Sequence, residues 1–259
     1  GSGVWHLDRG IGPAWFGELG YHLWFLGFLF AFALLGLPVF AFLEGAGGRR
    51  LVARLAAWTR PRGGALLLAV PITAVHLALR AAFPDEHDWA EFAVYFAFFV
   101  AGYLVLSDPR LEAAVRRDLP VALGLGVAGL AALYAADFPG WLERWSANPS
   151  YSLDYLLLQG LYAVYAWSWT VVAVGVAGRV RRFQTPVPRA AGLALPFYVL
   201  HQPVILVVAF VVVRWSAGIP VKLAVVLAGS FAVTAALCGL VGRARVLGPL
   251  LGARPAGGR

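Results

Sequence analysis

The residues best suited to chemistry are the few polar side chains that interrupt long apolar stretches of the sequence. His201 lies in LALPFYVLHQPVILVVAF and is followed by Gln202, while Tyr198 precedes it by three residues and therefore shares nearly the same helix face. A polar group in such surroundings is costly to keep, which favours a functional role. From these residues alone two interpretations stay open: a catalytic or substrate-binding histidine, and a buried His–Gln pair that hydrogen-bonds neighbouring helices beside a proline kink at Pro203.

Two further groups of polar residues stand at the ends of apolar stretches. His22 and Trp24 begin the stretch YHLWFLGFLF, a position that suits anchors at a membrane surface. His76 and Arg80 lie one helical turn apart, and Glu91 opens the next stretch. An Arg80–Glu91 pair close to His76 is one hypothesis. The favoured one is an arginine that snorkels beside an acidic loop.

Seven apolar stretches must position these residues. Each has about the ~20 residues that a helix needs to cross a bilayer. The stretches are Leu23–Leu43, Gly64–Ala81, Trp89–Leu106, Pro120–Ala136, Tyr155–Ala177, Ala191–Val213 and Val221–Val241. The chain of 259 residues is 61% hydrophobic and only 13% charged, with a mean hydropathy of +0.76. This composition predicts an all-α, polytopic membrane helix bundle with seven transmembrane helices.

The basic residues predict the orientation of the bundle. Sixteen of the 21 lysines and arginines fall in alternate loops and at the C-terminal end, while the other loops are acidic, so the positive-inside rule places the arginine-rich loops in the cytoplasm. Residue 1 is then outside and the C-terminus inside. We expect one integral membrane domain, with an outer leader at 1–20, the bundle at 21–242 and a cytoplasmic basic tail at 243–259. The abundance of Ala, Gly, Leu and Arg, with a single lysine, suggests the cytoplasmic membrane of a GC-rich bacterium.

Several other classes of function find no support in the sequence. The net charge of +8 is explained by topology, so we expect the lipid bilayer as a partner and no nucleic acid. The single cysteine, Cys238, cannot form a cysteine metal cluster, and no phosphate-binding Gly-rich loop, His-Glu-x-x-His zinc motif or Gly-x-Ser-x-Gly elbow is present. We therefore predict no metal site and no tightly bound cofactor.

Three segments resemble one family of membrane enzymes. The run Tyr21-His22-Leu23-Trp24-Phe25-Leu26 resembles the "HLWFL" helix of the acyltransferase 3 family, which includes glucan-succinylating enzymes and O-antigen acetylases. The segment Leu195–Pro203 resembles that family's "sYxxYLxHqPv" segment, and Tyr103–Asp108 before a basic loop is also similar. The three segments come in the family's order.

The resemblance implies a reaction and roles for residues. It implies transfer of an acetyl or succinyl-type group from acyl-CoA, as co-substrate, to a hydroxyl of a carbohydrate or glycolipid, with His201 as general base or acyl carrier. Substrate-binding residues would be His22, Trp24, Tyr198 and Gln202. The CoA phosphates would bind Arg179, Arg181 and Arg182, which topology explains equally well.

The resemblance also implies more helices than the seven counted here. Family members have about ten membrane helices, and the first carries an arginine and a histidine linked to catalysis. We expect those first three helices to be missing from this chain. The alternatives to an active enzyme are therefore an inactive truncated remnant and a non-enzymatic membrane protein such as a transporter subunit or scaffold.

Overall fold

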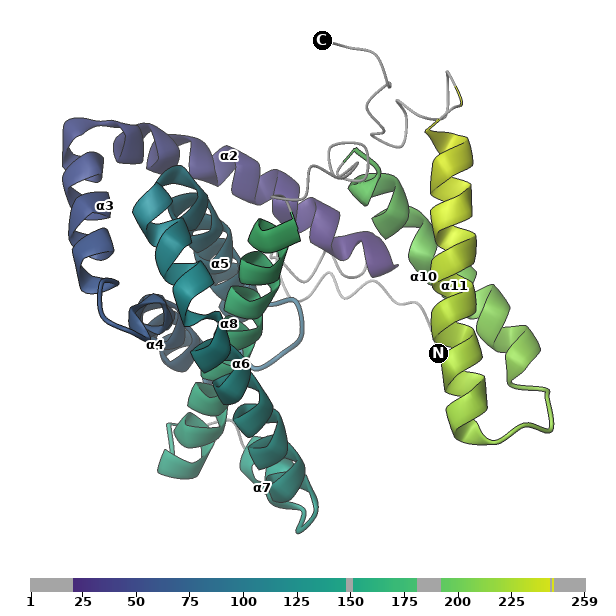
Figure 1. Cartoon of the computed structure of the whole chain (residues 1–259). Coiled ribbons are helices and arrows are strands. Elements are labelled where there is room, and N and C mark those ends of the chain that lie inside the picture. Colours follow the sequence, from purple (N-terminus) through teal and green to yellow (C-terminus); the bar gives the residue numbers. More distant parts are fainter. Residues whose placement is uncertain (1–20, 148–150, 181–191, 243, 245–259) are drawn as a thin grey trace, which may run out of the picture. The chain divides into compact units, whose positions relative to one another are not determined.

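The structure is a computed structural model that describes residues 21–147, 151–180, 192–242 and 244. These residues form helices, with no strand among them (Figure 1). The chain forms two compact units, Gly1–Arg182 (unit 1) and Phe183–Arg259 (unit 2). The predicted all-α membrane helix bundle is confirmed. The predicted leader at 1–20 and most of the predicted tail at 243–259 lie outside the described residues.

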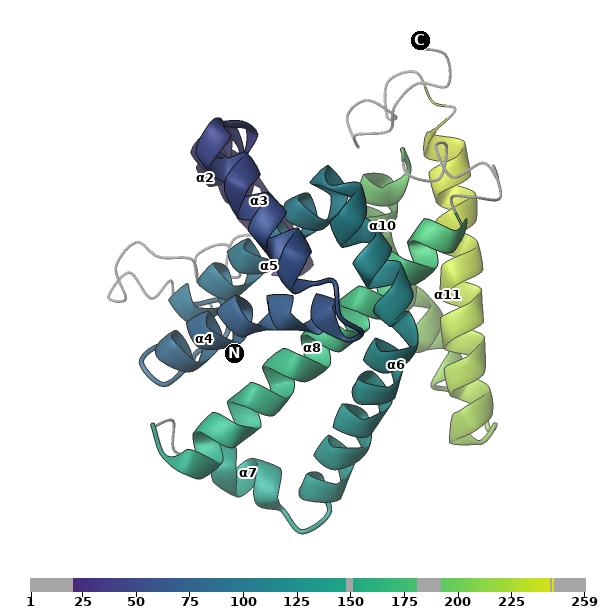
Figure 2. The same ribbon diagram turned by 60° about the vertical axis from the view of Figure 1, so that its left-hand side comes forward.

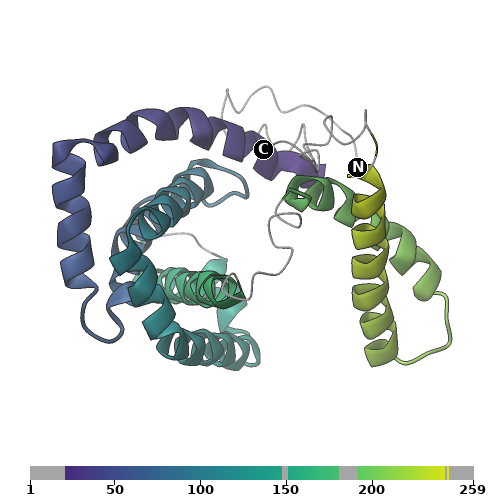
Figure 3. The same ribbon diagram turned by 45° about the horizontal axis from the view of Figure 1, so that its top comes forward.

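Unit 1 contains the greater number of described helices. In chain order they are η2 (Tyr21–Leu23), α2 (Trp24–Glu44), α3 (Ala46–Trp58), η3 (Gly64–Leu68), α4 (Ala69–Arg80), α5 (Trp89–Ser107), α6 (Pro109–Asp137), α7 (Trp141–Ser146) and α8 (Leu153–Val180). Figure 3 shows α3 turning sharply away from the end of α2. Gly48 permits that turn, because a Cβ there would lie only 2.2 Å from the Cα of Leu43.

Six helices of the described part are long and apolar enough to cross a membrane: α2, α5, α6 and α8 in unit 1, and α10 and α11 in unit 2. The seventh predicted span, Gly64–Ala81, is a shorter apolar segment over Gly64–Arg80 that divides into η3 and α4. The count of seven is therefore approximate. Pro71 lies in the first turn of α4, where a missing backbone N–H breaks no helical hydrogen bond.

Small residues allow α6 and α8 to pack together, and Figure 2 shows the two helices joined at one end by α7. A Cβ on Gly126 would lie 3.2 Å from the Trp169 ring, and one on Gly129 would lie 3.3 Å from the Tyr165 ring. Glycine at these two positions therefore permits close contact between the two helices. Gly124 has no such neighbour within 4 Å and does not contribute.

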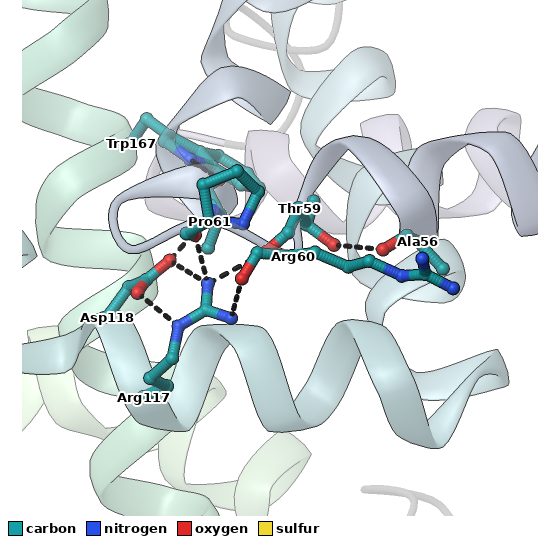
Figure 4. A network of polar contacts seen from close by, with 8 residues as sticks. Ala56, Thr59, Arg60, Pro61, Arg117, Asp118 and Trp167 are labelled. Atoms are coloured by element: carbon teal, nitrogen blue, oxygen red, sulfur yellow. Dashed lines mark hydrogen bonds and ion pairs between the residues drawn. The ribbon is translucent and has the colours of Figure 1, made fainter.

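A buried carboxylate fixes the connection between α3 and η3 (Figure 4). Asp118 of α6 is fully buried and accepts the backbone N–H of Ala65 at 2.9 Å. The Arg117 guanidinium contacts both Asp118 oxygens at 2.8 Å. It also donates to the carbonyl oxygens of Thr59, Arg60 and Pro61 at 2.6–2.8 Å. The aspartate thus has its partners supplied by protein, as burial requires.

Unit 2 contains two described helices, α10 (Ala194–Val212) and α11 (Ile219–Val241), which lie side by side (Figure 1). The connection between them is short. At that end Lys222 donates to the carbonyl oxygen of Val213 at 2.9 Å, and the Arg214 guanidinium lies 3.8 Å from the centre of the Phe210 ring. Both cations therefore hold positions at the helix ends, as expected for residues at a membrane surface.

Candidate functional site

Unit 1 contains a pocket of about 510 Å³ whose polar groups come mainly from three helices. His76 and Arg80 extend from the last turns of α4, Glu91 and Tyr95 from the first turns of α5, and Gln159 from α8. We call it the α4–α5–α8 pocket. It is completed by Val94, Phe98, Ser146, Tyr162, Ala163, Tyr165 and Ala166.

The polar groups of this pocket are joined in pairs. One ring nitrogen of His76, Nε2, lies 2.7 Å from Oε1 of Gln159, and because an amide oxygen only accepts, Nε2 carries a proton. Arg80 and Glu91 form an ion pair at 3.4 Å. The second oxygen of Glu91 accepts the backbone N–H of His87 at 2.8 Å. The Arg80–Glu91 pair near His76 is thus present, and Arg80 also donates to the carbonyl oxygen of Asp85 at 3.2 Å, so it contacts the acidic loop as the favoured interpretation expected.

The backbone around the pocket is also held by specific contacts. His87 has φ +60°, a left-handed conformation that is uncommon outside glycine and often marks functional sites. Tyr151 and Tyr155 donate to the carbonyl oxygens of Ala78 and Arg80 at 2.9 and 3.3 Å. Those carbonyls belong to the last turn of α4, where helix acceptors have no intrahelical donor. Arg80 is therefore held at its side chain by Glu91 and at its backbone carbonyl by Tyr155.

Of the predicted substrate-binding residues, Trp24 lies beside this pocket. Trp24 begins α2, and its ring centre lies 4.2 Å from that of His87 and 5.8 Å from that of Tyr95. His22 lies in η2, two residues earlier, and is half-buried. Neither residue lines the pocket. Trp24 instead packs against Tyr95, which lines the pocket, and against His87, which borders it. Its role as a direct substrate contact stays a prediction.

The other predicted residues form a site in unit 2. A groove of about 630 Å³ runs between α10 and α11, and its lining includes His201, Tyr198, Phe197 and Cys238. Nδ1 of His201 lies 2.6 Å from the backbone oxygen of Tyr198. Since a carbonyl oxygen accepts only, Nδ1 carries the proton and Nε2 is the basic nitrogen of the neutral ring. The remaining lining residues are Leu193, Ala194, Phe231 and Ala235.

The structure says less about the last predicted residues. Gln202 is half-buried in α10 and is not among the residues that line the groove. Arg179 is exposed at the end of α8 in unit 1. Arg181 and Arg182 lie outside the described residues. The prediction that these arginines bind CoA phosphates therefore stays a prediction.

Comparison with known families decides the class of the protein. A family model described as an acyltransferase domain, that of the acyltransferase 3 family, matches residues 2–243. The chain belongs to the acyltransferase 3 family. It is thus an integral membrane protein of a membrane acyltransferase family, which confirms the resemblance drawn from the segments at Tyr21–Leu26, Tyr103–Asp108 and Leu195–Pro203. Comparisons with curated proteins and with solved structures found no match.

Most residues of the acyltransferase's α4–α5–α8 pocket were not predicted from the sequence, Gln159 and Tyr95 among them. Gln159 is a buried polar residue within the apolar run YLLLQGLYAVYAW, and that interruption is the signal that could have found it. Tyr95 is one of many aromatic residues in α5, and nothing in the sequence separates it from the others. Only the meeting of α4, α5 and α8 shows that both face the same pocket.

Proposed function

We propose that this protein transfers an acetyl or succinyl-type group from acyl-CoA to a hydroxyl of a carbohydrate or glycolipid, in the cytoplasmic membrane of a bacterium. Membership of the acyltransferase 3 family supports acyl transfer in general. The donor, the acceptor and the membrane are our proposal. The observation that carries it is the groove in unit 2 that contains His201.

The groove suits an acyl thioester because its walls are largely apolar and a single imidazole lies in it. Its lining begins at Leu193, just before α10, and reaches His201 eight residues later, or about 12 Å along a helix. An acyl group with its thioester can lie along such a surface. From the sequence, Arg179, Arg181 and Arg182 remain the proposed contacts for the CoA phosphates.

In the proposed reaction Nε2 of His201 accepts the proton of the acceptor hydroxyl as its oxygen attacks the thioester carbonyl. The carbon–sulfur bond then breaks, and the CoA thiolate leaves and takes the proton back from the imidazolium. The products are an O-acyl ester and free CoA. The hydrogen bond from Nδ1 to the Tyr198 carbonyl holds the ring in the tautomer that this step requires.

The proposed orientation places the arginine-rich loops in the cytoplasm, where acyl-CoA is made. The α4–α5–α8 pocket lies at the opposite end of unit 1 from Arg117 and the loop that Asp118 holds, and it is therefore on the outer side in this orientation.

Substitutions at His201 test the proposal. The protein is assayed in membranes with labelled acetyl-CoA or succinyl-CoA, and base-labile label on glycans is measured. His201→Ala should lower transfer by at least about a hundredfold per folded molecule, as expected for loss of a general base. His201→Asn is the matched control, because its side-chain amide can still donate to the Tyr198 carbonyl without acting as a base. If His201→Asn transfers at the parent rate, the histidine is structural and the proposed mechanism is wrong.

A further inference from the structure

The α4–α5–α8 pocket of unit 1 has polar groups that the proposed transfer at His201 does not use. An ion pair, an imidazole and a buried amide come together from helices within largely apolar segments. Polar groups at such positions are expensive and usually mark a binding or transport site. A binding site is therefore the first explanation to consider for this pocket.

The charges of the pocket favour an uncharged ligand. Arg80 and Glu91 are paired with each other, so their formal charges cancel within the pocket. His76 is hydrogen-bonded to the neutral amide of Gln159. A phosphate or an ammonium group would need one member of the ion pair to be released, which costs more inside a membrane protein than at a water-exposed surface.

The shape and chemistry of the walls favour a ligand with both apolar and hydroxylated faces. Four aromatic rings line the pocket, from Tyr95, Phe98, Tyr162 and Tyr165. Aromatic rings pack against apolar C–H surface, whereas carboxylate, guanidinium, imidazole and amide groups exchange hydrogen bonds with hydroxyls. A pyranose ring offers both, with C–H groups on its faces and hydroxyls at its edge.

The polar groups are also held in place before any ligand binds. Glu91 receives one hydrogen bond from Arg80 and another from the backbone N–H of His87, which adopts a left-handed conformation to provide it. Tyr155 fixes the carbonyl of Arg80 itself. Such fixed donors and acceptors lose little freedom on binding, which favours recognition of a specific arrangement of hydroxyls.

We propose that the α4–α5–α8 pocket binds a neutral sugar unit of the acyl acceptor. This proposal rests on the proposed function for its biological meaning, but the binding itself can be tested without any acyl transfer. The sugar's hydroxyls would contact Glu91, Arg80 and His76, with a ring face against the tyrosines.

The binding test uses a thiol placed in the pocket. Ser146 lines the pocket and is exposed, so Ser146→Cys in a Cys238→Ala background gives one reactive position. The protein is held in lipid nanodiscs free of glycoside detergent and labelled with an impermeant maleimide. The probes are n-octyl glycosides of glucose, galactose, mannose, rhamnose and N-acetylglucosamine. Octyl phosphate and octyltrimethylammonium serve as charged comparisons.

At least one glycoside should slow labelling at position 146 by about fivefold at about four times its dissociation constant, because one fifth of the pockets are then empty. The same probe should leave Ser216→Cys unaffected, because Ser216 is exposed in the connection between α10 and α11. If no glycoside protects, or if octyl phosphate or the ammonium probe protects better than all of them, the proposal is overturned. Protection without any acyl transfer would leave the sugar site standing and reject the proposed function alone.

A pair of variants tests which residues bind the sugar. Glu91→Gln should raise the glycoside concentration needed for protection by about tenfold, as expected for loss of one charged hydrogen-bond partner. Glu86→Gln changes an exposed acid of the neighbouring loop and should have no effect. Equal protection in the two variants would contradict the assignment of Glu91. If Glu91→Gln does not fold, the result with the Ser146→Cys protein still decides whether the pocket binds sugar.

Discussion

The buried Asp118 network yields the most quantitative prediction about stability. Asp118 is fully buried, accepts the N–H of Ala65 and is contacted twice by Arg117, whose guanidinium also donates to three backbone carbonyls of the preceding loop. Asp118→Ala leaves the N–H of Ala65 without its acceptor and removes both carboxylate contacts of the Arg117 guanidinium. Removal of one partner of a fully buried ion pair costs about 3–5 kcal/mol. The Arg117 side chain is about one-third exposed, at 34%, so water can hydrogen-bond the guanidinium and offset part of the lost stability.

We therefore expect Asp118→Ala to lower the free energy of unfolding by about 3 kcal/mol. For a chain of this size that corresponds to a drop of roughly 6–12 °C in the midpoint of thermal unfolding. The measurement is the fraction of monodisperse protein left in detergent after heating at a series of temperatures.

Glu112→Ala is the matched control for this experiment. Glu112 is also an acid of α6 that pairs with an arginine, Arg116, but both side chains are 31% exposed. Exposed pairs of this spacing contribute about 0.3–0.5 kcal/mol, so the midpoint should fall by no more than about 2 °C. Equal losses in Asp118→Ala and Glu112→Ala would refute the argument that the buried carboxylate holds the loop between α3 and η3.

The remaining predictions concern helix packing, pH dependence and topology. Gly126→Leu should destabilise the protein by about 1–3 kcal/mol because its side chain meets the Trp169 ring, while Gly124→Leu should not, and equal midpoints would contradict the packing. Hydrogen bonds from Arg110 hold the pKa of the Asp108 carboxyl below its usual value of about 4. The Asp108 carboxylate therefore stabilises the fold above about pH 4, and this stabilisation is lost as the pH falls through the lowered pKa. The thermal midpoint of the parent should therefore exceed that of Asp108→Asn at pH 7, and the difference should shrink on acidification; a constant difference would rule out the ion pair as its cause. In a Cys238→Ala background, Ser146→Cys should react with an impermeant thiol reagent on intact cells and Arg62→Cys only after lysis, and the opposite pattern would invert the proposed orientation.

Most of the helices could be predicted from the sequence because hydropathy alone specifies them. Long apolar runs such as Trp24–Glu44 and Ile219–Val241 have no stable alternative to a helix in lipid, since their backbone groups must be satisfied within the segment. The exception is Gly64–Ala81, which is apolar throughout but divides into a 3-10 turn and a short α-helix. The division follows contacts from α6 and α8 to Ala65, made by Asp118 and Trp167, and these depend on the tertiary fold.

The candidate sites were predictable only in part. His201 and Tyr198 could be predicted because two residues three positions apart on one helix share a face, and the structure places both in one groove. The α4–α5–α8 pocket depends on residues far apart in the sequence, such as His76 and Gln159, which lie 83 positions apart and which no local pattern connects. The sequence allows an Arg80–Glu91 pair but does not favour it, because it does not show the four aromatic rings that surround the pair.

We propose that this member of the acyltransferase 3 family passes an acyl group from cytoplasmic acyl-CoA to a carbohydrate hydroxyl. The most direct test supplies labelled acetyl-CoA or succinyl-CoA to sealed membrane vesicles containing the protein, with either face outward, and measures base-labile label on glycans and glycolipids. We expect label only in inside-out vesicles, where acyl-CoA meets the arginine-rich loops, and at least about a hundredfold less with His201→Ala. Label of equal amount in right-side-out vesicles, or no carbohydrate ester with either acyl-CoA in either orientation, would contradict the account.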